Sequence, residues 1–340
     1  MTELTGKKLL VAPLDWGLGH ATRCIPIIRD LLHNHCEVWL AGEGAQEKLL
    51  REEFPLLPFL PLEGYRIRYA KRRLAIKLLL QIPSILRSIK AENNWLKKKV
   101  EQHGFDAVIA DNRYGLNHKN VFSVFITHQL QIKSSFGKLS EQLLQKWNYR
   151  LINKFNECWV PDEESENNLA GELSHPAKLP LIPVKYIGAQ SRLKKLDCEE
   201  LKDHLLIILS GPEPQRTIFE DWIIEELLNY TGTATVIRGL PGEKNIIPST
   251  NHIHFYNHLP SEELNKEMMK AEFIISRSGY STIMDIASLQ KKSILIPTPG
   301  QTEQEYLADT LLKRKFAFSI KQNNFSLHST LENARAFYLR

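Results

Sequence analysis

The stretch KLLVAPLDWGLGHATRCIPIIRDLLHN occupies residues 8–34 and decides the class of fold that the sequence predicts. Its first part, residues 8–13, is an apolar run of the kind found in strands that are buried on both faces. Residues 18–34 have apolar side chains at helical spacing, which are Ile25, Ile28, Leu31 and Leu32. A buried strand that passes through glycines into an amphipathic helix is the repeating unit of a parallel α/β sheet.

The same alternation continues to about residue 160. Short apolar runs predict strands at residues 37–41, 56–60, 107–110, 121–126 and 158–160. Helical spacing predicts helices over residues 45–53, 73–102 and 139–155, the second of them interrupted near Pro83. Alternating elements of these lengths favour a doubly wound parallel sheet.

The periodicity fades over residues 161–200 and then starts again. Strands are expected at residues 204–209, 233–238, 253–256, 273–276 and 293–297, and helices at 217–228, 261–270, 280–289 and 303–314. A last helix, from residue 327, is expected to cross back onto the first domain. The sequence therefore predicts an α/β protein of two doubly wound, Rossmann-like domains, residues 1–185 and 186–340, with ligands in a cleft between them.

Composition narrows the class of protein. The 340 residues include 44 Lys and Arg against 39 Asp and Glu, a formal charge of +5 that does not by itself indicate nucleic acid as a partner. The four cysteines form no C-x-x-C motif, so neither a zinc site nor a disulfide framework is indicated. No signal peptide precedes the first apolar run, and no apolar stretch reaches 18 residues. We expect a soluble, cytoplasmic protein.

The first strand-to-helix turn holds a candidate catalytic pair. Gly17 and Gly19 let the backbone turn sharply and approach a ligand, and His20 follows where a histidine can take a proton near neutral pH. Asp111 is expected at the carboxyl end of another strand, where its carboxylate would accept the Nδ1 proton of His20 and raise its basicity. Two alternatives stay open: a capping or packed histidine, and an aspartate that only caps a turn.

Two turns in the second half are rich in hydrogen-bonding groups. Residues 276–282 (SRSGYST) form a hydroxyl-rich loop with one cation, which suits a pyrophosphate at a helix N-terminus. Asp285 lies one turn into the next helix, where an acid can accept both hydroxyls of a ribose. Residues 297–306 (PTPGQTEQEY) present further polar side chains, Gln301 among them.

These motifs resemble the GT-B glycosyltransferases that use nucleotide sugars, particularly the MurG-like N-acetylglucosaminyltransferases. The pattern R-S-G-x-[ST]-x-x-x-[DE], from Arg277 to Asp285, and the pattern from Pro297 to Gln304 and Glu305 are similar to that family's donor domain. The G-x-G-H of residues 17–20 is similar to its glycine loop. Asp111 resembles the acid of the His–Asp pair in uridine-diphosphate glucuronosyl- and glucosyltransferases.

The resemblance implies how a UDP-sugar donor would be bound. The loop at Arg277 would face the diphosphate, Asp285 the uridine ribose, and the backbone near His258 the uracil. Gln304 and Glu305 would hold sugar hydroxyls. The residues expected to bind substrate are Gly17, Gly19, Ser210, Gly211, Arg216, His258, Leu259, Arg277, Ser278, Gly279, Ser281, Thr282, Asp285, Gln301, Gln304 and Glu305.

The sequence departs from the family pattern in the donor half. Pro212 and Pro214 remove two backbone donors beside Ser210, which weakens the case for that loop as a phosphate binder. Glu305 replaces a neutral amide, a change that bears on the preferred sugar, and Asp285 is shorter than the more common glutamate.

The resemblance implies an inverting sugar transfer with His20 as the base, to an acceptor that the sequence does not identify. We expect the acceptor to be a glycan or a lipid-linked molecule. No metal ion and no other cofactor is expected, because the sequence has no D-x-D triplet and GT-B enzymes commonly need no metal ion. One alternative is a hydrolase, because G-H-A-T-R-C, residues 19–24, also resembles the motif of the UDP-sugar hydrolase of the pseudaminic-acid pathway. Another is a protein that binds nucleotide sugars without turnover.

A basic amphipathic segment spans residues 66–99, with eleven Lys and Arg against the single acid Glu92. A segment of this kind can lie on an anionic membrane surface, which would suit a lipid-linked acceptor at the inner face of the cytoplasmic membrane. The alternative is a helix packed on the sheet with a solvated basic face, or one that binds an anionic glycan. The cations are Arg66, Arg68, Lys71, Arg72, Arg73, Lys77, Arg87, Lys90, Lys97, Lys98 and Lys99.

Overall fold

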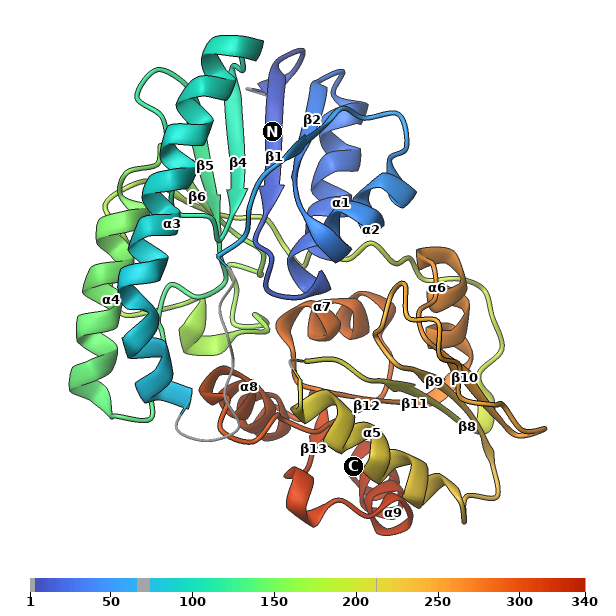
Figure 1. Cartoon of the computed structure of the whole chain (residues 1–340). Helices are drawn as coiled ribbons and strands as arrows, with labels where there is room; N and C mark the ends of the chain where they lie inside the picture. The colour runs from blue at the N-terminus through green and yellow to red at the C-terminus, as the bar shows by residue number, and fades with distance from the viewer. Residues whose placement is uncertain (1–3, 66–73, 212, 340) are drawn as a thin grey trace. The chain divides into compact units, whose positions relative to one another are not determined.

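The computed structural model describes residues 4–65, 74–211 and 213–339, without the side chains of residues 74–82. The chain divides into two compact units, Met1–Ser191 and Arg192–Arg340, each built on its own parallel sheet (Figure 1). Both units are doubly wound α/β domains, so the predicted fold class is confirmed.

Seven of the described strands form the sheet of the N-terminal unit, in the order β3-β2-β1-β4-β5-β6-β7. Every neighbouring pair in it is parallel. Its strands are β1 (Lys8–Pro13), β2 (Glu37–Gly42), β3 (Phe59–Pro61), β4 (Ala107–Asp111), β5 (Phe122–Ile126), β6 (Glu157–Val160) and β7 (Val184–Tyr186).

Helices cover both faces of this sheet (Figure 1). Leu9 and Val11 of β1 point into a core shared with α1 and α2, whereas Leu10 and Ala12 point into a second core shared with α3 and α4. Because successive side chains of a strand point to opposite faces, the unbroken apolar run of β1 contributes to both cores. The helices are α1 (Leu18–His33), α2 (Gly44–Glu53), α3 (Leu74–His103) and α4 (Lys138–Ile152).

The C-terminal unit repeats this plan with six of the described strands, in the order β10-β9-β8-β11-β12-β13. The strands are β8 (Leu201–Ile208), β9 (Thr233–Ile237), β10 (Ile253–Tyr256), β11 (Ala271–Ser276), β12 (Ser293–Leu295) and β13 (Phe318–Ser319). The helices are α5 (Gln215–Leu227), α6 (Ser261–Lys270), α7 (Tyr280–Leu289), α8 (Thr302–Lys313) and α9 (Leu327–Tyr338). Across all described ranges, no helix has both the length and the apolar character needed to cross a membrane.

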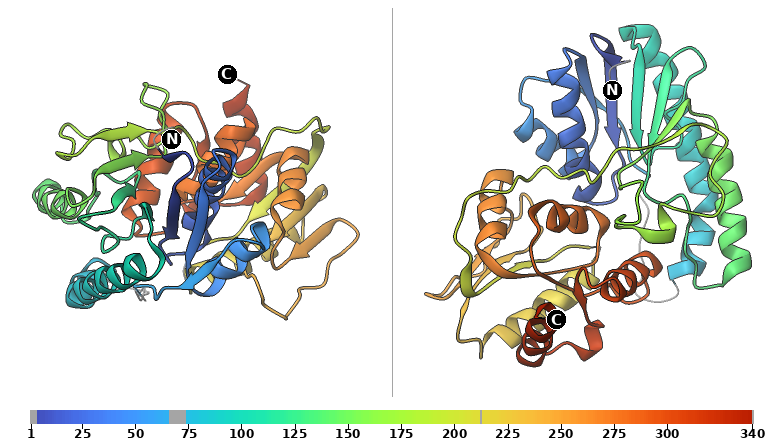
Figure 2. Two further views of the ribbon diagram at one scale, coloured as in Figure 1. Left: turned by 90° about the horizontal axis from the view of Figure 1, so that it is seen from above. Right: turned by 180° about the vertical axis from the view of Figure 1, so that it is seen from behind.

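The last helix packs on its own domain and corrects one expectation. Leu327, Leu331 and Ala334 of α9 join Phe219 and Ile223 of α5 in the core of the C-terminal unit. The two helices lie side by side in the front and rear views (Figures 1 and 2). The apolar face of α9 is therefore used within this unit, and it was wrong to expect that helix to cross onto the first domain.

Four further features differ from the sequence prediction. α3 continues through Pro83, because a proline inside a long helix removes one backbone hydrogen bond without ending the turns on either side. β3 begins at Phe59, later than expected. β7 was missed because it is only three residues long and half-buried at the sheet edge. The predicted domain boundary, between residues 185 and 186, falls inside β7, and the two units divide after Ser191.

Each sheet has one position where the chain reverses its direction of winding. In the N-terminal unit β1 lies between β2 and β4, and in the C-terminal unit β8 lies between β9 and β11. Crossovers leave these strands to opposite sides, so the loops at their carboxyl ends diverge and leave room for a ligand. The sequence motifs fall at these two positions, since Gly17–His20 follows β1, Asp111 ends β4, Ser210 follows β8 and Arg277 follows β11.

Candidate functional site

His20 and Asp111 meet at the switch point of the N-terminal sheet. The Nδ1 atom of His20 lies 2.9 Å from Oδ1 of Asp111, which is completely buried at the end of β4. The next residue, Asn112, has a φ of 53°, a left-handed conformation that asparagine tolerates better than most residues. The expected juxtaposition of a histidine and an acid is therefore present.

The glycine turn sets the entry into α1. Gly17 is the N-cap residue of α1 and has a φ of 78°, which a residue with a side chain adopts only with strain. The carbonyl oxygen of Gly17 accepts a hydrogen bond from the Gln46 amide at 3.1 Å, and that of Gly19 accepts one from the Thr22 hydroxyl at 3.0 Å. His20 thus stands in a first helical turn whose backbone is held from two sides.

The electrostatics of the pair differ from the expectation. Burial alone would raise the pKa of Asp111, but Arg23 and His20 outweigh it and hold that pKa below its ordinary value. The pKa of His20 is lowered, first by burial and then by the Arg23 guanidinium, which together exceed the opposing effect of Asp111. Asp111 does raise the pKa of His20, as predicted, but burial and the Arg23 charge, which the prediction left out, outweigh it, so that the net shift is downward.

The donor motifs of the C-terminal unit converge at its own switch point. The Ser278 hydroxyl donates to the carbonyl oxygen of Gln304 at 2.8 Å, which ties the loop after β11 to the start of α8. A Cβ added to Gly211, after β8, would lie 3.9 Å from the Thr298 hydroxyl, after β12. The loops that follow three neighbouring strands therefore lie together at one edge of the sheet.

Arg277 is buried beneath these loops, with 1% of its surface exposed. Its Nη1 donates to the carbonyl oxygen of Ile296 at 3.2 Å, its Nη2 donates to that of Gln215 at 3.1 Å, and its guanidinium lies 4.1 Å above the ring of Phe219. Burial lowers its pKa to about 10. Among the described residues no carboxylate pairs with this cation, so its positive charge is uncompensated beneath the loops.

Three other predicted donor residues brace the loops. Arg216 contacts Glu213 at 2.5 Å and Glu220 at 3.2 Å, so two carboxylates compensate its charge. Oε1 of Gln304 accepts the backbone N–H of Thr298 at 2.9 Å, and Oε1 of Glu305 accepts that of Gly300 at 2.9 Å. Each carboxamide or carboxylate therefore has one oxygen engaged with its own loop.

The remaining predicted donor residues lie at the same edge of the sheet. Gly279 is the N-cap residue of α7. His258 and Leu259 follow β10, two strands from β8, which is roughly 10 Å along the sheet. The half-buried ones, which remain accessible in part, are Ser210, His258, Ser281, Thr282, Asp285 and Gln301.

Three polar groups near this switch point have no hydrogen-bond partner in the part of the chain that the structure describes. They are the Ser276 hydroxyl, the Thr298 hydroxyl and Nε of Arg277, all buried at the carboxyl ends of β11 and β12. Buried polar groups are normally paired, and an unpaired donor costs free energy until a ligand satisfies it. This edge of the C-terminal sheet is therefore suited to an electron-rich ligand.

Known proteins share both the sequence signature and the fold. Residues 245–338 match the glycosyltransferase family 28 C-terminal domain. The chain is 22% identical, over 96% of its length and 88% of the relative's, to the UDP-N-acetylglucosamine--N-acetylmuramyl-(pentapeptide) pyrophosphoryl-undecaprenol N-acetylglucosamine transferase of Haemophilus ducreyi. The crystal structure of Acinetobacter baumannii MurG superposes with a TM-score of 0.56 at 14% identity, over 98% of this chain and 92% of that one. The chain is therefore a glycosyltransferase of the GT-B fold that is similar to MurG.

The fold is shared more widely than the sequence. Arabidopsis thaliana UGT89C1, solved with UDP-L-rhamnose, superposes with a TM-score of 0.62 at 9% identity, over 97% of this chain and 89% of that one. The family 28 match begins after β9 and includes β11, α7, β12 and α8 of this glycosyltransferase, and so the loops that follow β11 and β12.

Two residues of this glycosyltransferase's N-terminal site escaped the sequence analysis. Arg23 lies one turn after His20 on α1, and its guanidinium binds both carboxylate oxygens of Asp111. Its Nη1 lies 3.3 Å from Nδ1 of the buried His128, which follows β5. The i, i+3 spacing of His20 and Arg23 was the signal available, since such residues share a helix face.

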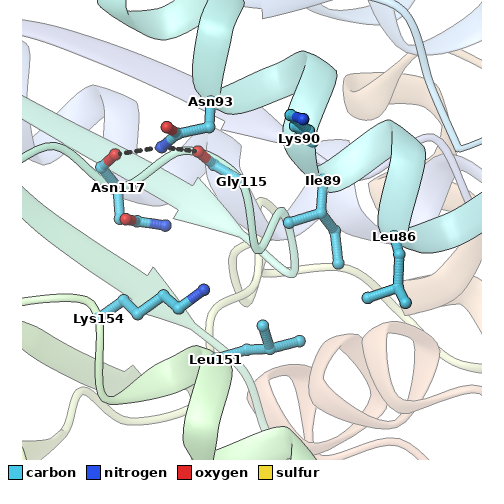
Figure 3. Close-up of a pocket in the computed structure, with 8 residues that line it drawn as sticks. All are labelled: Leu86, Ile89, Lys90, Asn93, Gly115, Asn117, Leu151 and Lys154. Atoms are coloured by element: carbon cyan, nitrogen blue, oxygen red, sulfur yellow. Dashed lines mark hydrogen bonds between the residues drawn. The ribbon is translucent and has the colours of Figure 1, made fainter.

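The N-terminal unit of the glycosyltransferase also has a pocket of about 330 Å³ between α3, the loop after β4 and the end of α4 (Figure 3). Leu86, Ile89 and Leu151 line it with apolar surface, and Lys90 and Lys154 supply two cations. In the described residues neither lysine has an ion-pair partner. Figure 3 shows the Lys154 side chain extending toward the middle of the pocket.

The wall of the pocket is fixed by hydrogen bonds. The Asn93 amide donates to the carbonyl oxygens of Gly115 and Asn117, at 3.0 and 2.8 Å (Figure 3). The buried Glu92 carboxylate accepts the backbone N–H of Gly115 at 3.0 Å and pairs with Arg113 at 2.8 Å. These bonds join α3 to the loop after β4. Gly115, where they meet that loop, lies only four residues after Asp111.

The basic segment 66–99 is described in part. Arg66, Arg68, Lys71, Arg72 and Arg73 lie outside the described residues, and the side chain of Lys77 is not described. In the described half, Arg87, Lys90, Lys97 and Lys98 are exposed, while Ile89 and Leu96 are buried in the domain core. No group of three or more histidine, cysteine or acidic side chains within the described ranges is arranged to hold a metal ion.

Proposed function

We propose that this glycosyltransferase moves a sugar from a UDP-sugar donor to a hydroxyl of a lipid-linked or glycan acceptor, with inversion at the anomeric carbon. The observation that carries the donor half is the set of buried, unpaired donors at the ends of β11 and β12, above an Arg277 cation with no carboxylate partner in the described chain. The printed name of the Haemophilus ducreyi relative, which specifies a UDP-sugar and a pyrophosphoryl-undecaprenol, supports this choice of substrates.

The proposed donor site uses the loops after β8, β11 and β12. The diphosphate is bound by the Ser210–Gly211 loop and by Ser278, Gly279, Ser281 and Thr282 at the positive end of the α7 dipole. The hydroxyls of Ser276 and Thr298 and the buried charge of Arg277 support that binding. Arg216 holds the β8–α5 loop through Glu213.

The nucleoside and the sugar are assigned to neighbouring positions. Asp285, one turn into α7, accepts the ribose hydroxyls, and the backbone at His258 and Leu259 meets the uracil edge. Gln304 keeps its NH₂ group, and Glu305 its second carboxylate oxygen, to hold sugar hydroxyls, with Gln301 beside them at the start of α8.

The base of the reaction is His20. The acceptor oxygen forms a bond to the anomeric carbon while the bond from that carbon to the diphosphate oxygen breaks, and UDP leaves on the opposite face. The acceptor proton passes to Nε2 of His20, and Asp111 stabilises the resulting imidazolium through Nδ1. The lowered pKa of His20 keeps the imidazole neutral, and so able to accept a proton, at neutral pH.

The protein's own groups neutralise the departing diphosphate in this proposal. The α7 dipole, the backbone N–H groups near it and the Arg277 charge act where negative charge develops, which is commonly the largest electrostatic contribution to catalysis. We therefore expect transfer to continue in the presence of excess EDTA, and a rate that depends on added Mg²⁺ or Mn²⁺ would contradict this part of the proposal.

The pocket of the N-terminal unit is the proposed site for an anionic, amphiphilic part of the acceptor. Lys90 and Lys154 would hold a phosphate, and Leu86, Ile89 and Leu151 would cover the adjoining apolar carbon chain (Figure 3). Leu86 is 45% exposed, which leaves the apolar floor open to such a chain. An enzyme with this acceptor would act as a peripheral protein at the inner face of the cytoplasmic membrane.

A two-stage measurement tests the function. Thermal denaturation is first followed with UDP, dTDP, GDP and ADP, because a ligand that binds only the folded state stabilises it by about 2.7 kcal/mol at 100 times its Kd. UDP is expected to give the largest rise in Tm. UDP release is then measured from UDP-sugars with and without a polyprenyl-phosphate-linked or free glycan acceptor.

The second stage separates the competing functions. Release that requires the acceptor supports transfer, whereas equally rapid release in its absence favours a hydrolase. UDP binding without turnover over the whole acceptor panel favours a non-catalytic protein. No change in Tm with any of these nucleotides would overturn the donor site itself.

A further inference from the structure

Arg23 donates two hydrogen bonds to Asp111, the acid of the proposed catalytic pair. Its Nε donates to Oδ2 of Asp111 at 2.5 Å, and its Nη2 donates to Oδ1. The side chain is only 2% exposed, and Asp111 is completely buried. A buried, two-point contact between a guanidinium and a carboxylate fixes both the position and the plane of the carboxylate.

The orientation of Asp111 matters because His20 shares one of its oxygens. Oδ1 receives Nη2 of Arg23 and also lies 2.9 Å from Nδ1 of His20. Nη2 itself lies 2.8 Å from the same Nδ1. Nδ1 therefore has two possible partners: it donates a proton to Asp111, or it accepts one from Arg23.

These two arrangements have opposite chemical consequences. When Nδ1 carries the proton, Nε2 is the bare, basic nitrogen. When Nδ1 accepts from Arg23, Nε2 carries the proton and cannot remove one from an acceptor hydroxyl. Arg23 donates one N–H group to each oxygen of the Asp111 carboxylate. The carboxylate is therefore held in place while Oδ1 remains in contact with the imidazole.

The groups that face His20 come from three elements. α1 supplies Arg23, β4 supplies Asp111, and the segment after β5 supplies His128. Cys24 of α1 contacts Asp111 instead, with its Sγ 3.6 Å from Oδ2. Burial, Arg23 and His128 disfavour the imidazolium of His20, and only Asp111 favours it. Both alternatives have one ionised partner, but Nη2 of Arg23 already donates to Oδ1 of Asp111, and Oδ1 lies within hydrogen-bond distance of Nδ1 as an acceptor for its proton.

We infer that Arg23 is a positioning residue for the proposed base: it holds the Asp111 carboxylate by both oxygens, so that Oδ1 takes the Nδ1 proton of His20 and Nε2 remains the basic nitrogen. This inference rests on the proposed function for its catalytic meaning, but the proton position that it specifies is a property of the protein alone.

The test combines nitrogen-15 NMR of the histidine rings with kinetics. His20 signals are assigned by their loss in His20→Gln, and the ring shifts then report which nitrogen carries the proton. The wild-type protein is expected to show the Nδ1–H form.

Arg23→Gln removes the cation and is expected to raise the titration midpoint of His20 and to lower kcat by on the order of 10²-fold, since a mobile carboxylate no longer orients the base. Arg29→Gln, which alters a surface ion pair on the same helix, is the matched control and is expected to change neither.

Arg23→Lys is a second variant, which tests the inference if Arg23→Gln does not fold. It keeps the buried charge but can contact only one carboxylate oxygen, so kcat should fall at least tenfold while the His20 midpoint stays close to that of the wild type. The inference is overturned if wild-type His20 carries its proton on Nε2, or if folded Arg23→Gln keeps the wild-type midpoint and kcat. If Arg23→Gln does not fold, an Arg23→Lys protein with wild-type kcat overturns it. A wild-type protein that neither transfers sugar nor releases UDP, yet has the Nδ1–H form that Arg23 controls, contradicts the proposed function and leaves the positioning role standing.

Discussion

Nδ1 of His20 lies 2.9 Å from Oδ1 of Asp111, although 91 positions separate the two residues in the sequence. The parallel pairing of β1 with β4 creates this contact, since Pro13 and Asp111 are register partners at the ends of those strands. The loop after β1 and the last residue of β4 must then lie at the same edge of the sheet. A strand order that the sequence could only suggest therefore determines the candidate catalytic pair.

Replacement of His20 by alanine is expected to lower kcat by about 10²–10⁴-fold, the usual contribution of a general base. Binding of UDP should not change, because the proposed donor residues belong to the C-terminal unit. Initial rates of UDP release with acceptor, together with the UDP-induced shift in Tm, measure the two effects separately. His33→Ala, an exposed histidine at the end of the same helix, is the control and should leave both unchanged. Wild-type turnover in His20→Ala would remove this residue from the mechanism.

The acid limb of kcat/KM is expected below pH 6.5. The reaction requires the neutral imidazole, and burial together with the Arg23 charge lowers the pKa of His20 from its ordinary value. Because the lowered pKa favours the neutral form in the folded protein, stability contributed by this group is complete above pH 6.5 and is lost as pH falls through the folded-state pKa. A rate profile from pH 4.5 to 8 is the measurement. An acid limb centred above pH 6.5 contradicts the assignment of His20 as the base.

Much of the fold was predictable because its signal is local. Residues 8–13 were predicted as a strand and form β1, and residues 280–289 were predicted as a helix and form α7. Where prediction failed, the deciding contacts were non-local. β7 has only three residues, of which Lys185 is exposed, and it exists because Cys158 pairs with Val184. The packing of α9 depends on a core whose other members reach back to Leu205, more than a hundred residues before Leu327.

The candidate site shows the same limit. The pairing of His20 with Asp111 was predicted from strand ends, whereas its charge balance was not, because Arg23 has no sequence signal beyond its helical spacing. In the donor domain the motif containing Arg277 was recognised, but its side chain was expected at the diphosphate and instead lies beneath the loops, bound to backbone carbonyls. Residue type and spacing identified the site, while the direction of each side chain depended on its neighbours in space.

Loss of the Arg277 charge is expected to weaken diphosphate binding more than nucleoside binding. Arg277→Gln removes a buried cation with no carboxylate partner in the described residues and releases the carbonyls of Ile296 and Gln215. A charged contribution of about 1.5–3 kcal/mol corresponds to roughly 10–100-fold in the Kd for UDP. Titration calorimetry with UDP and with uridine makes the comparison.

Arg335→Gln is the matched control for that experiment. Its guanidinium lies in the same unit, on α9, but Asp203 and Glu272 already compensate its charge. We expect its Kd for UDP to change less than threefold. An equal loss of affinity in the two variants would show that net positive charge, rather than the position of Arg277, governs binding.

The two pocket lysines are expected to act together on an anionic amphiphile. Lys90→Gln with Lys154→Gln removes both cations that line the pocket, and at about 1 kcal/mol for each lysine near an anionic surface the loss is roughly thirtyfold in affinity. Sedimentation with vesicles that contain anionic lipid measures membrane association, and competition by a short-chain alkyl phosphate measures binding of the isolated amphiphile. Lys97→Gln with Lys98→Gln, also exposed on α3, is the control. If both pairs reduce binding equally, the whole basic segment is responsible and the pocket has no special role.

Gly115 is expected to tolerate no side chain, because a Cβ there would lie 2.3 Å from the carbonyl oxygen of Ile89 and 2.5 Å from Cβ of Glu92. Both atoms belong to α3, so the helix or the loop after β4 must shift, at a cost of about 1–3 kcal/mol in the free energy of unfolding. That shift would also disturb the bond from the Gly115 N–H to Glu92. Gly42→Ala is the control, since its Cβ would lie 3.6 Å from the Phe59 ring, an ordinary contact. Urea denaturation should separate the two variants clearly, and a Gly115→Ala protein as stable as Gly42→Ala would mean that the loop and α3 pack less tightly than these distances require.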